Sequence, residues 1–283
     1  MFPASTLEFT GPNDLRELFM TIFQYGLIDI LNSLRKNDLI HMIGWQDMTL
    51  RYRRSKFGPF WITISMGIQI LTMGLVFGQL FGASIHKFLP FLAIGVILWS
   101  YITAVVSGGC TAFISATGMI TQLDIPMSFH LFRLVWSSFL FFIHNAVIIP
   151  LVLLAMLYPV NWVCLLAVPG FLLLTLNITW MGMFTGIFCT RFRDFPQLIA
   201  SILQVFFYVT PIMWMPDLAP QRASRVLLDM NPFHHLLSIV REPLMGTVPT
   251  LTSYLVCCFM AIVGWCAAAM LLGRYRDRIA YWL

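Results

Sequence analysis

The sequence predicts an all-α integral membrane protein with six transmembrane helices, an N-terminal amphipathic interface helix and two short re-entrant helices between helices 5 and 6. Composition supports this class, because 59% of the 283 residues are hydrophobic and only 10% are charged. Soluble domains carry about 25% charged residues, so the polar surface here is too small to cover a water-soluble globule. The third observation is six apolar runs of about 20 residues, the length that a helix needs to cross a bilayer.

These apolar runs divide the chain into two parts. Residues 1–58 are expected to form a cytoplasmic N-terminal segment, and residues 59–283 a six-helix transmembrane domain. The transmembrane domain includes an outer loop at 216–250, which holds the two short helices, and a cytoplasmic tail at 274–283. The predicted spans are 59–81, 88–110, 134–157, 162–189, 196–215 and 254–273.

The cationic residues predict the orientation of these spans. If both termini are cytoplasmic, 13 of the 17 Lys and Arg residues fall in cytoplasmic segments. Short cytoplasmic loops of membrane proteins are enriched in Lys and Arg. The distribution therefore predicts a cytoplasmic N-terminus and a cytoplasmic C-terminus.

Residues 26–43 are predicted to form the amphipathic helix. The apolar positions follow the spacing i, i+3, i+4 and i+7 and are Leu27, Ile30, Leu31 and Leu34. The residues expected to face away are Asp29, Asn32, Arg35 and Lys36. Such a helix lies along a membrane surface or packs on a partner, and periodicity alone leaves both alternatives open.

Two short helices are predicted in the loop before the last span. In the stretch MNPFHHLLSIVREPL, Asn231 is expected to cap a helix that has Pro232 in its first turn and ends at Pro243. About ten residues cannot cross a bilayer, so the helix is expected to be re-entrant or interfacial. A shorter helix near 222–228 would precede it.

Glycines four residues apart recur in two predicted spans. They are Gly74, Gly78 and Gly82 in the first span and Gly182 and Gly186 in the fourth. Small residues at this spacing let helices approach closely. The ridge in the first span is therefore predicted to lie at a helix contact near the outer half.

The motifs of several functional classes are missing from the sequence. It contains no P-loop, Rossmann or zinc-protease signature. The six cysteines lie in or beside apolar runs and are interpreted as small apolar residues. Together with the missing signatures, this interpretation predicts neither a metal site nor a catalytic residue. Proton-coupled carriers usually bury ionisable side chains in mid-span. The predicted spans carry neutral amides there instead, such as Gln69, Asn177 and Gln204, which are expected to bond between helices.

The net charge of +5 does not indicate a nucleic-acid partner, because the cations cluster at the ends of apolar runs.

Aromatic residues are concentrated in two of the predicted spans. They are Phe60 and Trp61 in the first span and Phe206, Phe207, Tyr208 and Trp214 in the fifth. Aromatic faces suit the C–H faces of sugar rings, so they could line the path of a polysaccharide. Contact with lipid is the alternative.

Several motifs together resemble one family. They are W-x-D-x-x-x-R-Y-R-x-S-x-x-G-P-x-W at 45–61, RFRDF at 191–195, TPIMW at 210–214, and NPF at 231–233 followed by Arg241 and Gly246. This combination resembles the permease subunits of type-2 ABC transporters for polysaccharide export. The subgroup that it resembles is the Wzm-type O-antigen permeases, with capsule and teichoic-acid permeases as near relatives.

The resemblance implies a function and partners. It implies a homodimer in the bacterial inner membrane that forms a continuous channel with two copies of a separate ABC ATPase subunit. ATP and Mg would bind that partner, so this chain needs no cofactor. The substrate would be an undecaprenyl-linked polysaccharide moved outward from the cytoplasmic leaflet. Two alternatives from other classes stay open: an integral-membrane enzyme acting on lipid-linked sugars, and an ABC permease for small solutes.

The resemblance also implies site residues. Spans one and five would line the channel, where Arg51, Arg53 and Arg54 would meet an anionic lipid pyrophosphate. The ATPase contacts would include Leu34, Arg35, Gly118, Gln122, Asp124 and Pro126. The outer gate would include Asn231, Pro232, Phe233 and Arg241. Asp124 departs from the family pattern, since relatives often carry a basic or neutral residue there.

Overall fold

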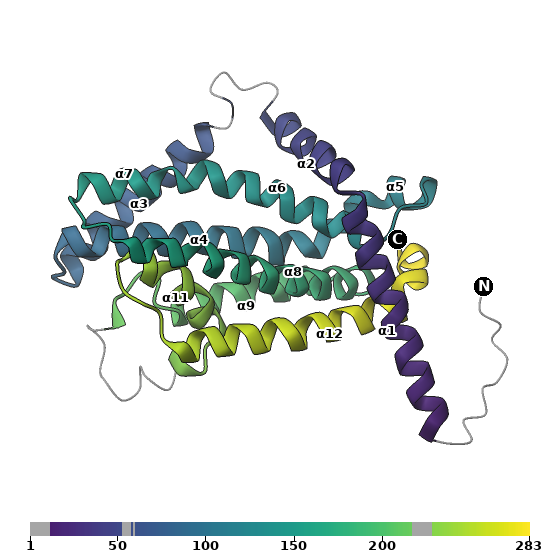
Figure 1. The fold of residues 1–283 in the computed structure, drawn as a ribbon. Helices are drawn as coiled ribbons and strands as arrows, with labels where there is room; N and C mark the ends of the chain where they lie inside the picture. Colours follow the sequence, from purple (N-terminus) through teal and green to yellow (C-terminus); the bar gives the residue numbers. More distant parts are fainter. Residues whose placement is uncertain (1–11, 53–57, 59, 217–227) are drawn as a thin grey trace.

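The computed structural model describes residues 12–52, 58, 60–216 and 228–283, and every regular element in this part of the chain is helical (Figure 1). The α-helices are α1 (Pro12–Arg35), α2 (Asn37–Tyr52), α3 (Phe60–Leu80), α4 (Ile85–Ala112), α5 (Thr117–Gln122), α6 (Ser128–Ala146), α7 (Ile148–Ala155), α8 (Ala167–Arg191), α9 (Phe195–Val209), α11 (Pro232–Leu244) and α12 (Leu251–Trp282). Two 3-10 helices, η1 (Ile114–Ala116) and η2 (Trp162–Leu166), complete the described elements.

Helix α4 is the centre of the bundle. It packs against α3, α6, α8, α9 and α11 and is buried along most of its length. A helix that is apolar on all sides is stable in such a position, because every face has a neighbour. The glycines of the fourth span lie at a close contact with this helix. A side chain added at Gly109 of α4 would lie 2.5 Å from the Gly182 carbonyl oxygen of α8, so the two backbones cross at close range.

The structure has five helices long and apolar enough to cross a membrane among the described residues. The predicted fifth span, 196–215, is wrong as a single helix, because α9 ends at Val209. Thr210 adopts an extended conformation (φ −78°, ψ 137°), as is usual for a residue that precedes proline. Fifteen helical residues extend about 22 Å, which is less than the hydrocarbon core of roughly 30 Å.

The predicted helix 26–43 is two helices, α1 and α2, which meet at Lys36. Asn37 and Asp38 follow this break, and Asn and Asp are residues that favour helix starts. The predicted polar face is wrong at Asp29, which is buried together with Ser33. On the predicted apolar face Ile30 is buried, and Leu27, Leu31 and Leu34 are exposed on the single chain, as they would be on a face that a membrane surface or a partner covers.

Helix α1 crosses α12 at one end of the bundle, which we call the α1 end (Figure 1). The crossing is close because both helices have glycine at the contact. A side chain at Gly26 would lie 1.9 Å from the Ala269 carbonyl oxygen, and one at Gly273 would lie 1.9 Å from the Ile22 carbonyl oxygen. Helix α12 continues to Trp282, so the predicted tail 274–283 is mostly helical.

Helix α11 lies at the opposite end of the bundle, near the start of α12, and we call this the α11 end (Figure 1). Asn231 caps α11 as predicted. The helix has 13 residues and is buried on nearly all sides, including the side that carries Arg241. Gly246 ends it with φ 77°, a conformation that suits glycine. Most of the predicted helix near 222–228 lies outside the described residues.

Candidate functional site

One face of α3 carries a line of polar side chains. Ser65, Gln69 and Thr72 are exposed and follow each other at steps of four and three residues, and Gln79 continues the line two turns later. These steps place the four side chains on one side of the helix. An otherwise apolar helix therefore exposes a polar face, which we call the α3 stripe.

Helix α9 carries a second such line, the α9 stripe. Gln197, Ser201, Gln204 and Tyr208 are exposed and follow each other at steps of four, three and four residues. Leu203, on another side of the helix, is buried. Gln69 and Gln204 were expected to bond between helices, and the structure exposes both; of the three amides, Asn177 forms such a bond, to the Cys257 carbonyl at 3.1 Å.

The aromatic residues predicted for the substrate path divide into two groups. Phe206 and Phe207 are half-buried, and their rings pack on Phe233 at 4.9 Å and on Trp99 at 5.9 Å between centroids. These two side chains therefore attach α9 to α11 and α4.

The other predicted path aromatics are more accessible. Phe60 and Trp61 at the start of α3 and Tyr208 at the end of α9 are exposed. Trp214 donates its indole N–H to the Tyr208 carbonyl at 3.1 Å and so closes the turn after α9. Exposed rings thus occur on the two helices that carry the polar stripes.

The predicted gate residues lie together at the α11 end. The Asn231 side-chain oxygen accepts hydrogen bonds from the backbone N–H groups of Phe233 (3.0 Å) and His234 (3.4 Å). Its amide nitrogen donates to the Thr210 hydroxyl at 2.8 Å. Pro232 occupies the first helical turn, where its missing N–H costs nothing. The cap of α11 is therefore also a contact with the turn that follows α9.

Arg241 forms a second contact with the same turn. Its guanidinium donates to the Pro211 carbonyl at 2.5 Å and stacks over the Phe91 ring of α4 at 4.0 Å from the centroid. The residue is only 3% exposed. Burial lowers the pKa of Arg241 to about 10, so the side chain is charged at neutral pH. A fixed positive charge thus holds α4, α11 and the 210–213 turn together.

The α1 end contains a polar pocket of about 750 Å³. Three of the predicted ATPase contacts, Arg35, Asp124 and Pro126, line it. Lys36 also lines the pocket and donates its ammonium group to the Asp124 carbonyl oxygen at 3.4 Å. Sequence reasoning missed the third wall, which the end of α12 supplies through its residues Arg276, Asp277 and Ala280.

The other predicted ATPase contacts lie apart from this pocket. Gly118 and Gln122 are exposed on α5. Leu34 is exposed and lines a separate apolar groove of about 640 Å³ beside α6 and α8. The structure therefore gathers half of the predicted set into one pocket and leaves the other half on neighbouring surfaces.

Asp29 has a structural role that the sequence pattern missed. Its carboxylate accepts hydrogen bonds from the Met127 N–H (3.1 Å), the Ser128 N–H (2.9 Å) and the Ser128 hydroxyl (2.6 Å). It therefore caps the start of α6 from another helix, where a negative charge is favourable. The Ser33 hydroxyl adds a bond to Ser128 at 2.6 Å. The pair Asp29 and Ser33, one helical turn apart, is the signal that could have found it.

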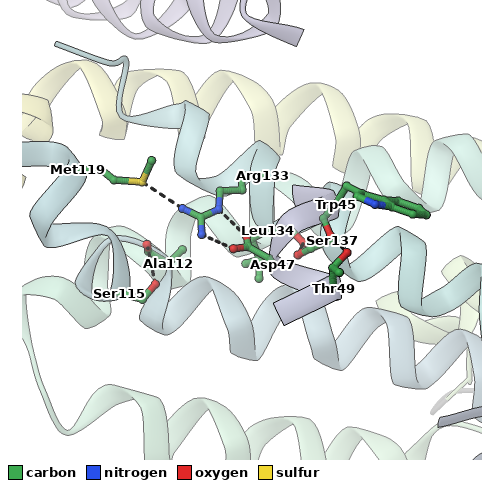
Figure 2. A network of polar contacts seen from close by, with 9 residues as sticks. All are labelled: Trp45, Asp47, Thr49, Ala112, Ser115, Met119, Arg133, Leu134 and Ser137. Atoms are coloured by element: carbon green, nitrogen blue, oxygen red, sulfur yellow. Dashed lines mark hydrogen bonds and ion pairs between the residues drawn. The ribbon is translucent and has the colours of Figure 1, made fainter. Parts of the chain in front are cut away.

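A second polar link joins α2 to α6 (Figure 2). The Arg133 guanidinium donates from two nitrogens to the two carboxylate oxygens of Asp47, each at 2.5 Å. A third nitrogen lies 3.2 Å from the Met119 sulfur of α5. Asp47 is the acidic position of the W-x-D motif, so the motif serves to attach α2 to α6.

The predicted cations before the first span lie where the described residues end. Helix α2 ends at Tyr52, with Arg51 in its last turn. Arg53 and Arg54 lie outside the described residues. Their predicted role in meeting a lipid pyrophosphate therefore stays a prediction.

Comparisons with known proteins show the family of this chain. The model of the family described as ABC-2 type transporter matches residues 38–245. The O-antigen export system permease protein RfbA of Myxococcus xanthus is 24% identical over 198 residues, which cover 68% of this chain and 75% of that protein. A protein of the same name from Klebsiella pneumoniae is 23% identical over 216 residues, which cover 75% of this chain and 82% of that protein.

Proposed function

This chain belongs to the ABC-2 type transporter family, and on that premise we propose that it is the permease subunit of an exporter for O-antigen. The proposed substrate is the undecaprenyl-linked polysaccharide, which moves outward across the bacterial inner membrane. The relatives from Myxococcus xanthus and Klebsiella pneumoniae are O-antigen export system permease proteins, which supports the proposal. The family resemblance predicted from the sequence motifs is confirmed.

The observation that carries the proposal is the pair of polar stripes on α3 and α9. Their amides and hydroxyls both donate and accept hydrogen bonds, as do the hydroxyls of a sugar chain. Facing hydrocarbon, these groups would lose their hydrogen bonds with water at a substantial free-energy cost. They are therefore suited to a water-filled passage for an uncharged, hydroxyl-rich polymer, with the exposed rings of Trp61 and Tyr208 as surfaces for sugar faces.

A second copy of the chain would close this passage. Helix α3 packs on α4 and α6, and α9 packs on α4 and α8, which leaves both stripes on the outside of one chain. A homodimer would bring the stripes of two chains around a common path. In this arrangement the buried cap of Asn231 and the Arg241 contact would hold the outer gate at the α11 end.

The α1 end is the proposed cytoplasmic side, where two copies of a separate ABC ATPase would bind. Its polar pocket presents charges of both signs, from Arg35 and Lys36 on one wall and Asp124 and Asp277 on others. A partner that changes shape as it binds and hydrolyses ATP with Mg could grip such a surface. Both termini would then be cytoplasmic, and the cations Arg51, Arg53 and Arg54 would lie where the lipid pyrophosphate arrives.

Export in cells tests the proposal. Deleting the gene should remove O-antigen from the surface and let undecaprenyl-linked glycan accumulate inside, and the wild-type gene should restore display. Replacing Gln69 and Gln204 together by leucine should reduce export about thirtyfold, because each lost hydrogen-bonding group is worth about 1 kcal/mol and two are removed. The matched control replaces the exposed neighbours Ile68 and Ile202 by leucine and should export normally.

The outcomes of this experiment distinguish export of O-antigen from export of capsule or teichoic acid. Loss of capsule or teichoic acid with normal O-antigen would assign the chain to another branch of the family. Normal display of all surface glycans in the deletion strain would show that the proposal is wrong. Membrane levels of each variant, measured on the same cells, distinguish lost transport from lost protein.

A further inference from the structure

A cavity of about 490 Å³ lies between α4 and α6 near the α1 end. We call it the α4–α6 cavity and define it by Asp47, Gly108, Ser115, His130, Arg133 and Ser138, which line it. Its space comes from small residues on α4, since Ala104, Gly108 and Ala112 follow each other at steps of four. The opposite wall is polar and belongs to α6. None of the sequence motifs pointed to this cavity.

His130 is the residue that indicates a ligand. It is 3% exposed and lines the cavity, and neither of its ring nitrogens has a hydrogen-bond partner among the described residues. A neutral imidazole carries one donor and one acceptor. Leaving both unpaired in a buried site costs about 1–3 kcal/mol for each group. Both nitrogens are themselves buried, so a polar molecule in the cavity would remove that cost once the ring turns toward it.

The charges in the cavity restrict what that molecule can be. Arg133 is the cation of the lining, and Asp47 already holds it through two short hydrogen bonds (Figure 2). The pair is close to neutral as a unit, and the Asp47 carboxylate repels a second anion. An uncharged ligand therefore fits the site better than a phosphate does.

The hydroxyl groups of the lining favour a ligand that donates hydrogen bonds. Ser115 donates to the Ala112 carbonyl at 3.3 Å, and Ser137 donates to the Leu134 carbonyl at 2.9 Å (Figure 2). The oxygen lone pairs of both hydroxyls are left to accept. Phe141 adds a flat apolar wall. Several acceptors, one imidazole and an aromatic surface together match a sugar ring, which has O–H donors at its edge and C–H groups on its face.

We propose that the α4–α6 cavity binds an uncharged, hydroxyl-rich head group, a sugar residue, at the α1 end of the bundle. The inference rests on the proposed function and deepens it, because it gives a lipid-linked glycan a binding site before transport. Its volume lies within the range of about 300–1,000 Å³ that small-molecule sites have. The sugar can come from a membrane glycolipid or from free saccharide, and the experiment separates the two sources.

Native mass spectrometry of the full chain in lipid nanodiscs tests the proposal. The probes are monoglucosyl-diacylglycerol, diacylglycerol and phosphatidylglycerol at equal content, with free glucose as a competitor. Wild-type protein should retain the glucosyl lipid at least fivefold more than either other lipid. His130→Phe should reduce that retention about tenfold, because it removes both ring nitrogens. Ala104→Leu, at an exposed position on the rim, should reduce it by filling space, and it keeps the test valid if the histidine variant fails to fold.

The control is His144→Phe, the same substitution in the same helix at a position that does not line the cavity. It should retain the glucosyl lipid as the wild type does. Equal retention of all three lipids by wild-type protein, or no effect of either cavity variant, would overturn the proposal and assign only water to the cavity. Preference for phosphatidylglycerol would overturn the uncharged class. Displacement of the glucosyl lipid by millimolar glucose would show that free saccharide is also a source, and resistance would assign the site to the lipid-linked form.

Surface display of O-antigen in the same strains separates this inference from the proposed function. Wild-type cells that display O-antigen while the protein retains no glucosyl lipid contradict the binding site alone. Wild-type protein that retains the glucosyl lipid in a strain whose display does not depend on the gene contradicts the proposed function alone.

Discussion

Replacing Asp29 by alanine should release the start of α6 from α1. The carboxylate is 5% exposed and accepts two backbone N–H groups, from Met127 and Ser128, together with the Ser128 hydroxyl. Hydrogen bonds to a charged group contribute about 1.5–3 kcal/mol each, and the two N–H groups at the start of α6 would lose their partner. Part of this loss is recovered when water enters, so we expect a local destabilisation of about 3 kcal/mol.

Amide hydrogen exchange in detergent micelles measures this effect at the residues concerned. A local loss of about 3 kcal/mol corresponds to exchange roughly 150-fold faster at the Met127 and Ser128 amides, and α1 should exchange faster as well. Asp29→Asn should fall between wild type and alanine, because one side-chain oxygen still accepts while the new amide nitrogen faces a donor.

Asp38→Ala is the matched control. Asp38 lies in the first turn of α2 and is exposed, so its removal should change the exchange of α1 and of the α6 start by less than about twofold. If Asp29→Ala exchanges like this control, the carboxylate does not hold α6, and the reasoning from its three contacts is refuted.

Three further perturbations test contacts elsewhere in the bundle. Gly273→Val should lower the thermal midpoint of the detergent-solubilised chain by about 5 °C, because a side chain there overlaps the backbone of α1, whereas Gly67→Ala, which meets open space, should leave it unchanged. Arg241→Met should speed amide exchange in the turn after α9 about tenfold, because it removes a buried charged hydrogen bond; an unchanged rate would contradict the role of the guanidinium. Arg133→Lys should weaken the link between α2 and α6 by about 1 kcal/mol, since the pair is partly exposed and lysine cannot bridge both oxygens. A double-mutant cycle with Asp47→Asn measures that coupling, and a value near zero would count against it.

Local chemistry explains which parts of the fold the sequence predicted. Long apolar runs identified five spanning helices because a helix in hydrocarbon must be apolar over its length. Asn231 and Pro232 marked the start of α11 because capping depends on neighbouring residues alone. The early end of α9 was also encoded locally, by the Thr210–Pro211 step, but the apolar residues beyond it concealed the signal.

The remaining parts depend on partners that are distant in sequence. Helical periodicity placed Asp29 on the outer face, since a carboxylate is costly to bury without a partner. Its partners, Met127 and Ser128, lie almost 100 residues further along the chain. The same applies to Asp47 and Arg133, whose separate positions indicated a motif and a topology signal but not a pair. Helical periodicity shows which residues share one face of a helix. It does not show which distant residue forms hydrogen bonds with them.

The first two turns of α6 connect the surfaces of the α1 end with the interior. Asp29 of α1 binds the start of this helix at Ser128, and Asp47 of α2 binds it at Arg133. His130 lies between these two attachment points and lines the α4–α6 cavity. Hydrogen bonds and ion pairs are directional, so α1 or α2 cannot shift relative to α6 without breaking a charged contact. The polar pocket beside α1 and the cavity beside His130 are therefore both connected to one structural element, the start of α6.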